Sequence, residues 1–360
     1  MLNRLKIAQL LPSLSQSLLT AYDEEITIGM RLWNSCKNDE FLCTSISNKS
    51  QWDIPLWQGT LSPTFNYEQI KSYTIYGVDG SQIYPDRHRG LPCYLINIGS
   101  VVINYGPQSK ALFESEPYIF AHSNDTRVLF SAPELVNGER TEYEFKKALQ
   151  LAKVHKPATF LFDGALIFWH LEKHDIEIRN RFMASYIMLC EQLYQEQVVY
   201  AGYISLPKSK ELINIIRSVA QNMGEAFEGL YMVDADIMHY TLQPYESSIF
   251  FEHRSSIVES YPEHLRPYFC YINTGAEIAR IELPAWIAQD EPKRDQLLRT
   301  ILDQCKKGQG YPVVLSEAHE QAVVTTADRE FFYTMLFKTD QSNKFASSST
   351  KLAKKMTRLY

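Results

Sequence analysis

The sequence predicts an α/β fold in which a mixed sheet is flanked by helices, with additional N- and C-terminal helices. Helical and β-type patterns alternate between residues 141 and 222, as is typical of a sheet with partly parallel strands. Upstream, residues 73–105 hold three β-type runs. Two apolar runs, one in this segment and one near residue 160, end on Asp-Gly. The 360 residues, 45% of them apolar, are enough for a large core.

Residues 1–70 are expected to form a helical arm followed by a loop. Apolar residues recur at helical spacing up to residue 30, and Pro12 interrupts them, which predicts one broken helix or two short ones. Residues 35–70 are rich in Asn, Ser and Trp and are typical of irregular structure. We expect the arm to pack on its own domain or on a second copy of the chain.

Residues 71–338 are predicted to form the main domain. Its expected elements, in order, are a meander of strands at 73–79, 93–99 and 101–105, a helix at 141–154, a strand at 158–163, a helix at 175–197, a strand at 198–206, a helix at 208–222, a strand pair at 268–283, a helix at 293–306 and one or two helices at 315–337. The tail, residues 339–360, is Ser-rich and then basic, which is typical of a solvated end.

The net charge of −6 excludes a global basic field that would attract nucleic acid. A site for a polyanion must therefore be local or mediated by a metal. The six cysteines form neither a Cys-x-x-Cys pair nor a zinc-finger spacing, so reduced thiols are expected. The sequence shows no signal peptide and no run of 18 apolar residues, which predicts a cytoplasmic protein without a membrane segment.

Asp79 and Asp163 each end an apolar run, and each precedes a glycine. A carboxylate at the end of a buried strand is costly to desolvate unless a positive group meets it, so the pair favours a metal site. In an open α/β sheet, side chains from separate strands converge at such an edge. The alternative is that both are Asp-Gly turns whose side chains cap loops.

Other acidic residues are open to two interpretations. Glu139, Glu142 and Glu144 lie on the predicted helix before the second Asp-Gly, and periodicity alone does not choose between them or exclude a solvated helix face. Asp234 and Asp236 resemble a metal-binding pair, but no second element is tied to them, so a structural role is favoured.

His319 falls on the apolar side of a predicted helix, for which Ser316 is a candidate N-cap. It is either a buried core residue or a group near the site. Lys208 and Lys210 follow a predicted strand and could contact phosphate, although solvation is the simpler interpretation. With Arg280, they are the candidates for a local positive surface that a polyanion could contact.

Taken together, these segments resemble the NurA family of DNA-end-processing nucleases from about residue 73 to 337. Residues 1–70 and the tail carry no motif of the family. The resemblance rests on Val78-Asp79-Gly80-Ser81, Arg140-x-x-x-Glu144, Leu161-Phe162-Asp163-Gly164, Lys208-Ser209, Ala279-Arg280-Ile281-Glu282-Leu283-Pro284-Ala285-Trp286, Tyr311-Pro312 and Ala318-His319.

The resemblance implies an RNase H-like core and cleavage of DNA that depends on Mn²⁺ or Mg²⁺, with a two-metal site. It implies Asp79, Glu144 and Asp163 as metal ligands, with Tyr311 and His319 completing the catalytic site. Glu144 is preferred to its neighbours because the family places its helix Glu about as far before the strand Asp as here, 19 residues. The resemblance also implies a homodimeric ring and a HerA-type hexameric ATPase as partner.

The expected function is therefore a metal-dependent deoxyribonuclease, with exonuclease and single-strand endonuclease activity, that processes DNA ends. Two alternatives belong to other classes. One is a catalytically weak module that threads DNA for a translocase, and the other is a phosphohydrolase that acts on nucleotides. DNA end resection and defence against phage remain equally open as the biological setting.

Overall fold

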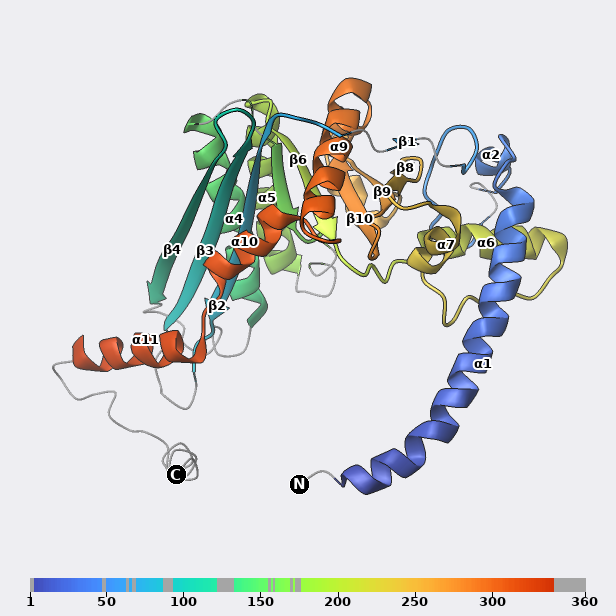
Figure 1. Ribbon diagram of the computed structural model, residues 1–360, viewed down its shortest axis with the longest axis horizontal. Helices are drawn as coiled ribbons and strands as arrows, with labels where there is room; N and C mark the ends of the chain where they lie inside the picture. The colour runs from blue at the N-terminus through green and yellow to red at the C-terminus, as the bar shows by residue number, and fades with distance from the viewer. Residues whose placement is uncertain are drawn as a thin grey trace. The chain divides into compact units, whose positions relative to one another are not determined.

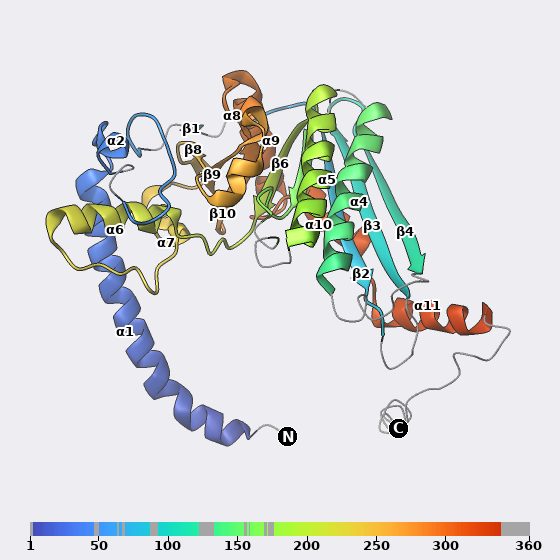
Figure 2. The same cartoon turned by 180° about the vertical axis from the view of Figure 1, so that it is seen from behind.

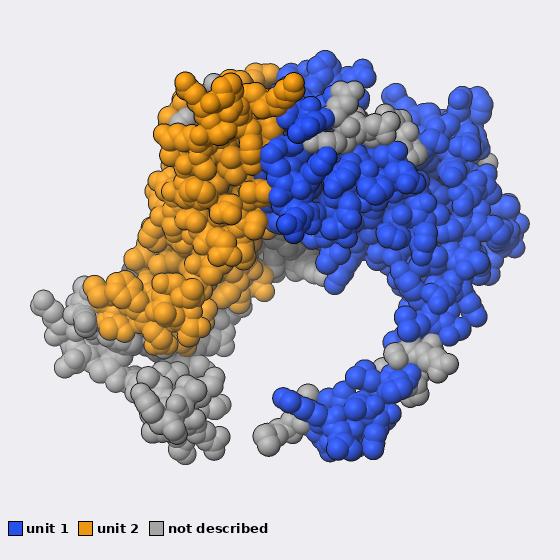
Figure 3. All heavy atoms as spheres, viewed as in Figure 1, with its two compact units in different colours: residues 1–70, 164–168, 201–312 blue, residues 71–163, 169–200, 313–360 orange. Residues whose placement is uncertain are grey.

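The computed structural model describes residues 3–46, 50–62, 65–66, 69–86, 93–121, 133–154, 157, 159–168, 171 and 176–339. Two compact units are built from alternating segments of the chain (Figure 3). Unit 1 holds residues 1–70, 164–168 and 201–312, and unit 2 holds residues 71–163, 169–200 and 313–360. The predicted division into domains at residues 70 and 338 stays a prediction. The basic tail lies outside the described residues.

Unit 2 contains a mixed sheet, as predicted. Its strands lie in the order β5 (Thr159–Asp163), β2 (Tyr73–Ile83), β3 (Cys93–Tyr105) and β4 (Lys110–Ala121). β2 pairs with β5 in parallel, whereas β2–β3 and β3–β4 are antiparallel. Apolar residues of β2 and β3 pack with Val136 in a buried cluster. Successive side chains of a strand point to opposite faces, and most residues of these two strands are buried, so both faces of the strands are covered.

The predicted strands 93–99 and 101–105 are wrong as separate elements. They form the single strand β3, and the third strand of the meander is β4, which the sequence analysis did not predict. Gly99 suggested a break in the pattern, but here it provides space. A Cβ at position 99 would lie 2.3 Å from the carbonyl oxygen of Ala318 and 2.4 Å from the nitrogen of Ala322. The glycine therefore lets a helix lie directly on the strand.

That helix is α10 (Val313–Ala322), which contacts β2 and β3 on one face of the sheet (Figure 1). On the opposite face lie α4 (Pro133–Val154) and α5 (Ile176–Gln195), which pack against each other (Figure 2). α11 (Thr326–Thr339) follows α10, so the predicted segment 315–337 contains two helices. Helices thus cover both faces of the sheet of unit 2.

Unit 1 contains strands in the order β1 (Phe65–Asn66), β7 (Glu246–Ser247), β9 (Pro267–Asn273), β10 (Ile278–Pro284) and β6 (Val199–Ile204, in unit 1 from Ala201), with β8 (Phe251–Glu252) also paired to β9. The predicted strand pair at 268–283 is confirmed as the antiparallel pair β9–β10. The helices are α1 (Arg4–Cys36), α2 (Leu42–Ile46), α6 (Glu211–Met223), α7 (Asp234–Thr241), α8 (Ala285–Ala288) and α9 (Glu291–Lys307), with the 3₁₀ turns η2 (Ser256–Ser260) and η3 (Glu263–Leu265).

The N-terminal arm is one continuous helix rather than a broken one. α1 begins after Asn3, whose side chain accepts a hydrogen bond from the Lys6 amide, and runs through Pro12. A proline removes one helical hydrogen bond, yet the bonds of the flanking turns remain, so the helix continues. Its C-terminal part buries Leu32 and Trp33 in the core of unit 1. None of the helices in the described residues combines the length and hydropathy that a membrane span needs.

Candidate active site

Two of the predicted acidic residues lie side by side in the sheet of unit 2. β2 and β5 are parallel neighbours, and Val78 is in register with Phe162. The next residues along these strands are Asp79 and Asp163, so their backbones are separated by about one strand spacing, roughly 4.8 Å. Parallel pairing of the two Asp-Gly runs therefore explains why residues 84 positions apart lie on neighbouring strands. Asp163 ends β5 as predicted, but the predicted strand end at Asp79 is wrong, because β2 stays paired with β3 up to Ile83.

Glu144 reaches these residues from helix α4, and Gly80 makes its approach possible. A Cβ at position 80 would lie 2.6 Å from Oε1 of Glu144 and 2.7 Å from Cγ of Arg140. Any larger residue there would push the helix residues away from the strand. The glycine after Asp79 thus has a steric role that the turn interpretation of Asp-Gly does not include.

The electrostatics of Glu144 reflect this position. Its residue is only 9% exposed. Burial raises the pKa of Glu144 to about 8; the charge of Arg140 opposes this rise, and the charges of Asp79 and Asp163 add to it. Ionisation of a buried carboxyl group next to two other carboxylates is unfavourable unless a positive charge lies nearby. The acidic cluster of Asp79, Glu144 and Asp163 therefore favours binding of a cation.

His319 joins the cluster from helix α10, on the other face of the sheet. Its Nδ1 lies 2.8 Å from Oδ2 of Asp79, while Oδ1 of Asp79 accepts a hydrogen bond from the Gly80 amide. The His319 side chain is 59% exposed, so it is not a core residue. α10 begins at Val313, which corrects the expectation that Ser316 caps the helix.

The neighbouring acidic residues have other partners. Glu139 is bonded to Tyr94 and Arg181, and Glu142 lies 3.6 Å from Lys146. The described contacts therefore place Glu144, and not these two, beside Gly80 of β2, and the choice of Glu144 as the site residue stays a prediction.

The second acidic pair is structural, as the sequence favoured. Asp234 is fully buried and accepts hydrogen bonds from the amides of Leu212 and Ile213 at the start of α6. A carboxylate at this place satisfies amides that the helix leaves without partners. Asp236 accepts a hydrogen bond from Tyr22 and caps its own helix.

Two of the residues predicted to bind DNA are occupied within unit 1. Arg280 is 2% exposed and bonds Glu211 and Glu282, each at 2.8 Å. Its burial argues against contact with DNA and gives it a structural role. Lys210 donates hydrogen bonds to backbone carbonyls, whereas Lys208 is exposed.

Tyr311, the remaining predicted residue, belongs to unit 1, where its ring packs edge-on against that of Tyr203 at 5.3 Å. Its role in the site stays a prediction.

Arg140 is the residue that sequence reasoning missed as part of the site. Its Nε lies 3.2 Å from Oε1 of Glu144. The spacing of four residues between opposite charges on one helix was the available signal, since such residues face each other.

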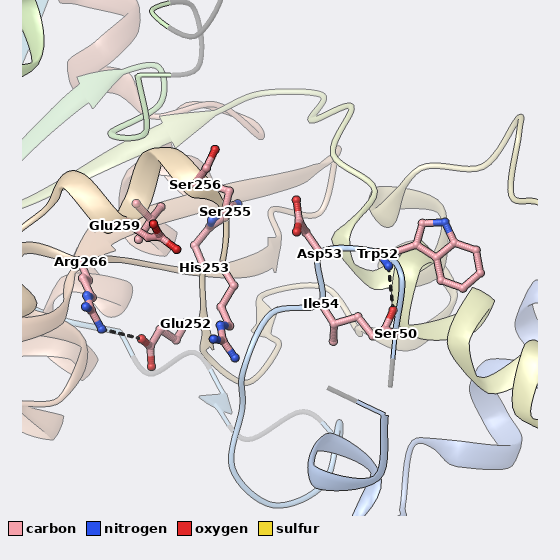
Figure 4. A pocket seen from close by; sticks show the side chains of 12 residues that line it. Ser50, Trp52, Asp53, Ile54, Glu252, His253, Ser255, Ser256, Glu259 and Arg266 are labelled. Atoms are coloured by element: carbon pink, nitrogen blue, oxygen red, sulfur yellow. Dashed lines mark hydrogen bonds and ion pairs between the residues drawn. The ribbon is translucent and has the colours of Figure 1, made fainter. Parts of the chain in front are cut away.

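Unit 1 also contains a pocket of about 730 Å³ (Figure 4). Its lining mixes acidic, basic and polar residues and includes none of the predicted site residues; Arg266 and Glu252 face each other across 3.9 Å. The pocket therefore shares no lining residue with the acidic cluster.

Carboxylate oxygens are the donors that Mg²⁺ and Mn²⁺ prefer, so the chemistry of the acidic cluster fits the implied metals. In the described part of the chain, no three His, Cys, Asp or Glu side chains are already grouped to hold an ion. Instead, Asp79 contacts His319 and Glu144 contacts Arg140. Binding of an ion would require these carboxylates to exchange protein partners for the metal.

A mixed α/β sheet flanked by helices, with acidic side chains on the neighbouring strands β2 and β5, is that of an RNase H-like fold of the nuclease class. The family model for the NurA domain matches residues 73–324. The chain belongs to the NurA domain family, and this membership supports a DNA nuclease.

Solved structures that resemble the chain include two endonucleases V, each 14% identical. The one from Bacillus subtilis is covered over 90% of its chain by 81% of this one, with a TM-score of 0.34. The one from Ciona intestinalis, in complex with inosine-containing DNA, is covered over 87% by 74% of this chain, with a TM-score of 0.29. The protease–reverse transcriptase of prototype foamy virus is 19% identical over 40% of this chain and 19% of its own, with a TM-score of 0.22. Likenesses this weak carry no functional inference. Comparison with the curated proteins finds no match.

Proposed function

We propose that this protein is a divalent-metal-dependent deoxyribonuclease whose metal ligands are Asp79, Glu144 and Asp163. The observation that carries the proposal is that Asp79 and Asp163 lie on paired neighbouring strands with the buried Glu144 beside Gly80. Burial and the charges of Asp79 and Asp163 raise the pKa of Glu144 against the charge of Arg140. A cation would compensate this surplus of negative charge. When bound, divalent cations supply Lewis acidity at a phosphodiester and lower the pKa of a bound water.

The protein's own groups have distinct tasks in this proposal. Asp79 holds the Nδ1 side of His319, which leaves Nε2 of an exposed imidazole to contact a phosphate oxygen or to donate a proton. We favour a role of His319 in orienting the phosphate, because proton transfer in metal-assisted hydrolysis does not require a histidine. Lys208 remains the basic candidate for contact with the DNA backbone, and Tyr311 a further candidate for the site.

The family resemblance supports further parts of the proposal. These are exonuclease and single-strand endonuclease activity on DNA ends, a homodimer with a positive channel, and a HerA-type hexameric ATPase as partner. All six cysteines are free and buried, which agrees with the reducing cytoplasm as the proposed compartment.

The test is cleavage of labelled single- and double-stranded DNA by the pure full-length protein with Mn²⁺, Mg²⁺ or excess EDTA, and with free nucleotides as competing substrates. The proposal expects DNA fragments with a divalent ion and none with EDTA. Turnover of nucleotides without DNA cleavage would instead identify a phosphohydrolase. DNA binding without cleavage under any metal would identify a threading module.

A further inference from the structure

Arg140 is held at the acidic cluster by a chain of hydrogen bonds. Its Nη1 donates to Oε1 of Gln82 at 3.2 Å. The amide of Gln82 in turn donates to Tyr84 at 2.7 Å and to Asn137 at 3.3 Å, and Tyr84 donates to Asn137 at 2.6 Å. This anchoring fixes the guanidinium beside Glu144.

The pair of Arg140 and Glu144 is poorly explained by helix stability. On a helix, a pair of opposite charges stabilises best when the acidic residue precedes the basic one, and here the order is reversed. The ion pair is also part of a partly buried polar network rather than a solvated helix surface, because Nε of Arg140 is buried and only a third of its side chain is exposed. The reason for this arginine therefore lies in the carboxylate that it faces.

Positive groups of the protein already engage part of the acidic cluster. Arg140 faces Glu144, and His319 faces Asp79. Arg140 carries a permanent charge and lies at an oxygen that a metal would need. A cation that binds Glu144 must therefore compete with the guanidinium for the same carboxylate.

We propose that Arg140 is a positioning residue that acts as an internal counter-ion: it holds Glu144 in the metal-free protein and yields this carboxylate to the divalent cation. This inference rests on the proposed function. Arg140 stabilises the ionised form of Glu144 in the metal-free protein, and for the same reason it weakens binding of the metal. Removing its charge then makes the metal bind more tightly, the opposite of what loss of a ligand does.

The experiment measures Mn²⁺ affinity by isothermal titration calorimetry and metal-free melting temperature, for the full-length protein at fixed pH and salt. Arg140→Gln is expected to lower the Kd for Mn²⁺ about 10-fold, because a positive charge no longer repels the cation or competes for Glu144. Loss of an outer-shell partner that supports a metal ligand would instead raise the Kd, by roughly 10–100-fold. It is also expected to lower the melting temperature without metal. Arg140→Lys, which keeps the charge, is expected to leave both values near those of the wild type.

Arg181→Gln is the matched control. Arg181 of α5 forms an ion pair at 3.3 Å with Glu139, which lies on α4 like Glu144 but is not part of the acidic cluster. It is expected to leave the Kd unchanged. If Arg140→Gln fails to fold, Gln82→Leu replaces it: releasing the guanidinium from Gln82 is expected to tighten Mn²⁺ binding a few-fold. An unchanged or raised Kd in the folded variant would overturn the inference.

Asp79→Asn separates this inference from the proposed function. Loss of Mn²⁺ binding in Asp79→Asn, together with an unchanged Kd in Arg140→Gln, would leave the metal site standing and refute the counter-ion alone. If the wild-type protein did not bind Mn²⁺, or bound it equally well without Asp79, both the proposed metal site and the counter-ion role of Arg140 would be refuted.

Discussion

The acidic cluster of unit 2 and the buried charges around Arg280 in unit 1 use the same residue types in different arrangements. Around Arg280, Glu211 also accepts a contact from His253, and the second oxygen of Glu282 accepts the amides of Leu166 and Ile167. Both oxygens of Glu282 accept hydrogen bonds, and Oε1 of Glu211 has two nitrogen partners. In the acidic cluster, the described contacts are those of Arg140 with Glu144 and of His319 and the Gly80 amide with Asp79.

The pKa values of the two buried glutamates differ accordingly. Burial acts to raise both. For Glu211, the charge of Arg280 and the bond to His253 outweigh burial and hold its pKa well below the ordinary range. For Glu144, one opposing arginine does not outweigh burial and two further carboxylates. A raised pKa alone does not identify a cation site, because burial and the charge of Glu211 also raise the pKa of the structural Asp234 to about 8. What sets Glu144 apart is that Asp79 and Asp163 lie near it on paired neighbouring strands.

The sharpest way to break this comparison is to remove charge from the acidic cluster. Asp79→Asn or Asp163→Asn is expected to lower metal-dependent DNA cleavage by roughly 10³-fold or more, while the fold stays intact. Without metal, the melting temperature is expected to stay near that of the wild type or to rise, because a repelling charge is gone. Both are measured on one preparation, with Asp328→Asn on exposed α11 as control. Wild-type cleavage by a folded Asp79→Asn protein would remove the site.

The buried charges of unit 1 should respond in stability rather than in chemistry. Arg280→Met leaves Glu211 and Glu282 buried without their cation, and breaking a buried pair in this way costs about 3–5 kcal/mol of unfolding free energy. Denaturant unfolding measures this loss. The triple change with Glu211→Gln and Glu282→Gln is expected to recover part of it, because neutral amides need no counter-charge. A stable Arg280→Met variant with weakened DNA binding would restore the DNA-contact interpretation.

How far the sequence predicts this molecule depends on the range of the interaction. The ends of β5 and the β9–β10 pair follow from local patterns, and so does the meeting of Asp79 and Asp163 once their strands are taken as parallel. β3 was divided at Gly99 because the helix that needs this glycine lies more than 200 residues away. The burial of Arg280 likewise depends on residues from other segments, such as Glu211, which no local window contains.

Replacing His319 is expected to lower DNA cleavage less than replacing Asp79 or Asp163. Because its side chain is largely exposed, His319→Ala is expected to leave the melting temperature near that of the wild type. Cleavage is expected to fall by roughly 10²-fold, the lower end of the range for general acid–base groups, since the metals would carry part of the chemistry. His239→Ala, an exposed histidine of unit 1, serves as control. A destabilised His319→Ala protein with normal activity per folded molecule would return this residue to a structural role.

The smallest effect is the pH dependence of stability, and its sign separates the two glutamates. The pKa of Glu144 in the folded state is about 8, above its ordinary 4.5, so the folded protein binds more protons than the unfolded chain between these values. Its contribution to stability is therefore greatest at low pH and is lost as the pH rises from about 5 to 8. Melting of the metal-free protein across this range should show the decline. Glu144→Gln, which stays neutral, should reduce the decline without abolishing it, because burial also raises the pKa of Asp234 in unit 1 to about 8. Glu142→Gln on the same helix should leave the decline unchanged. Glu211, with its lowered pKa, acts in the opposite direction and only below about pH 4.5. If Glu144→Gln keeps the full decline, Glu144 is compensated as completely as Glu211, and the difference between the two regions disappears.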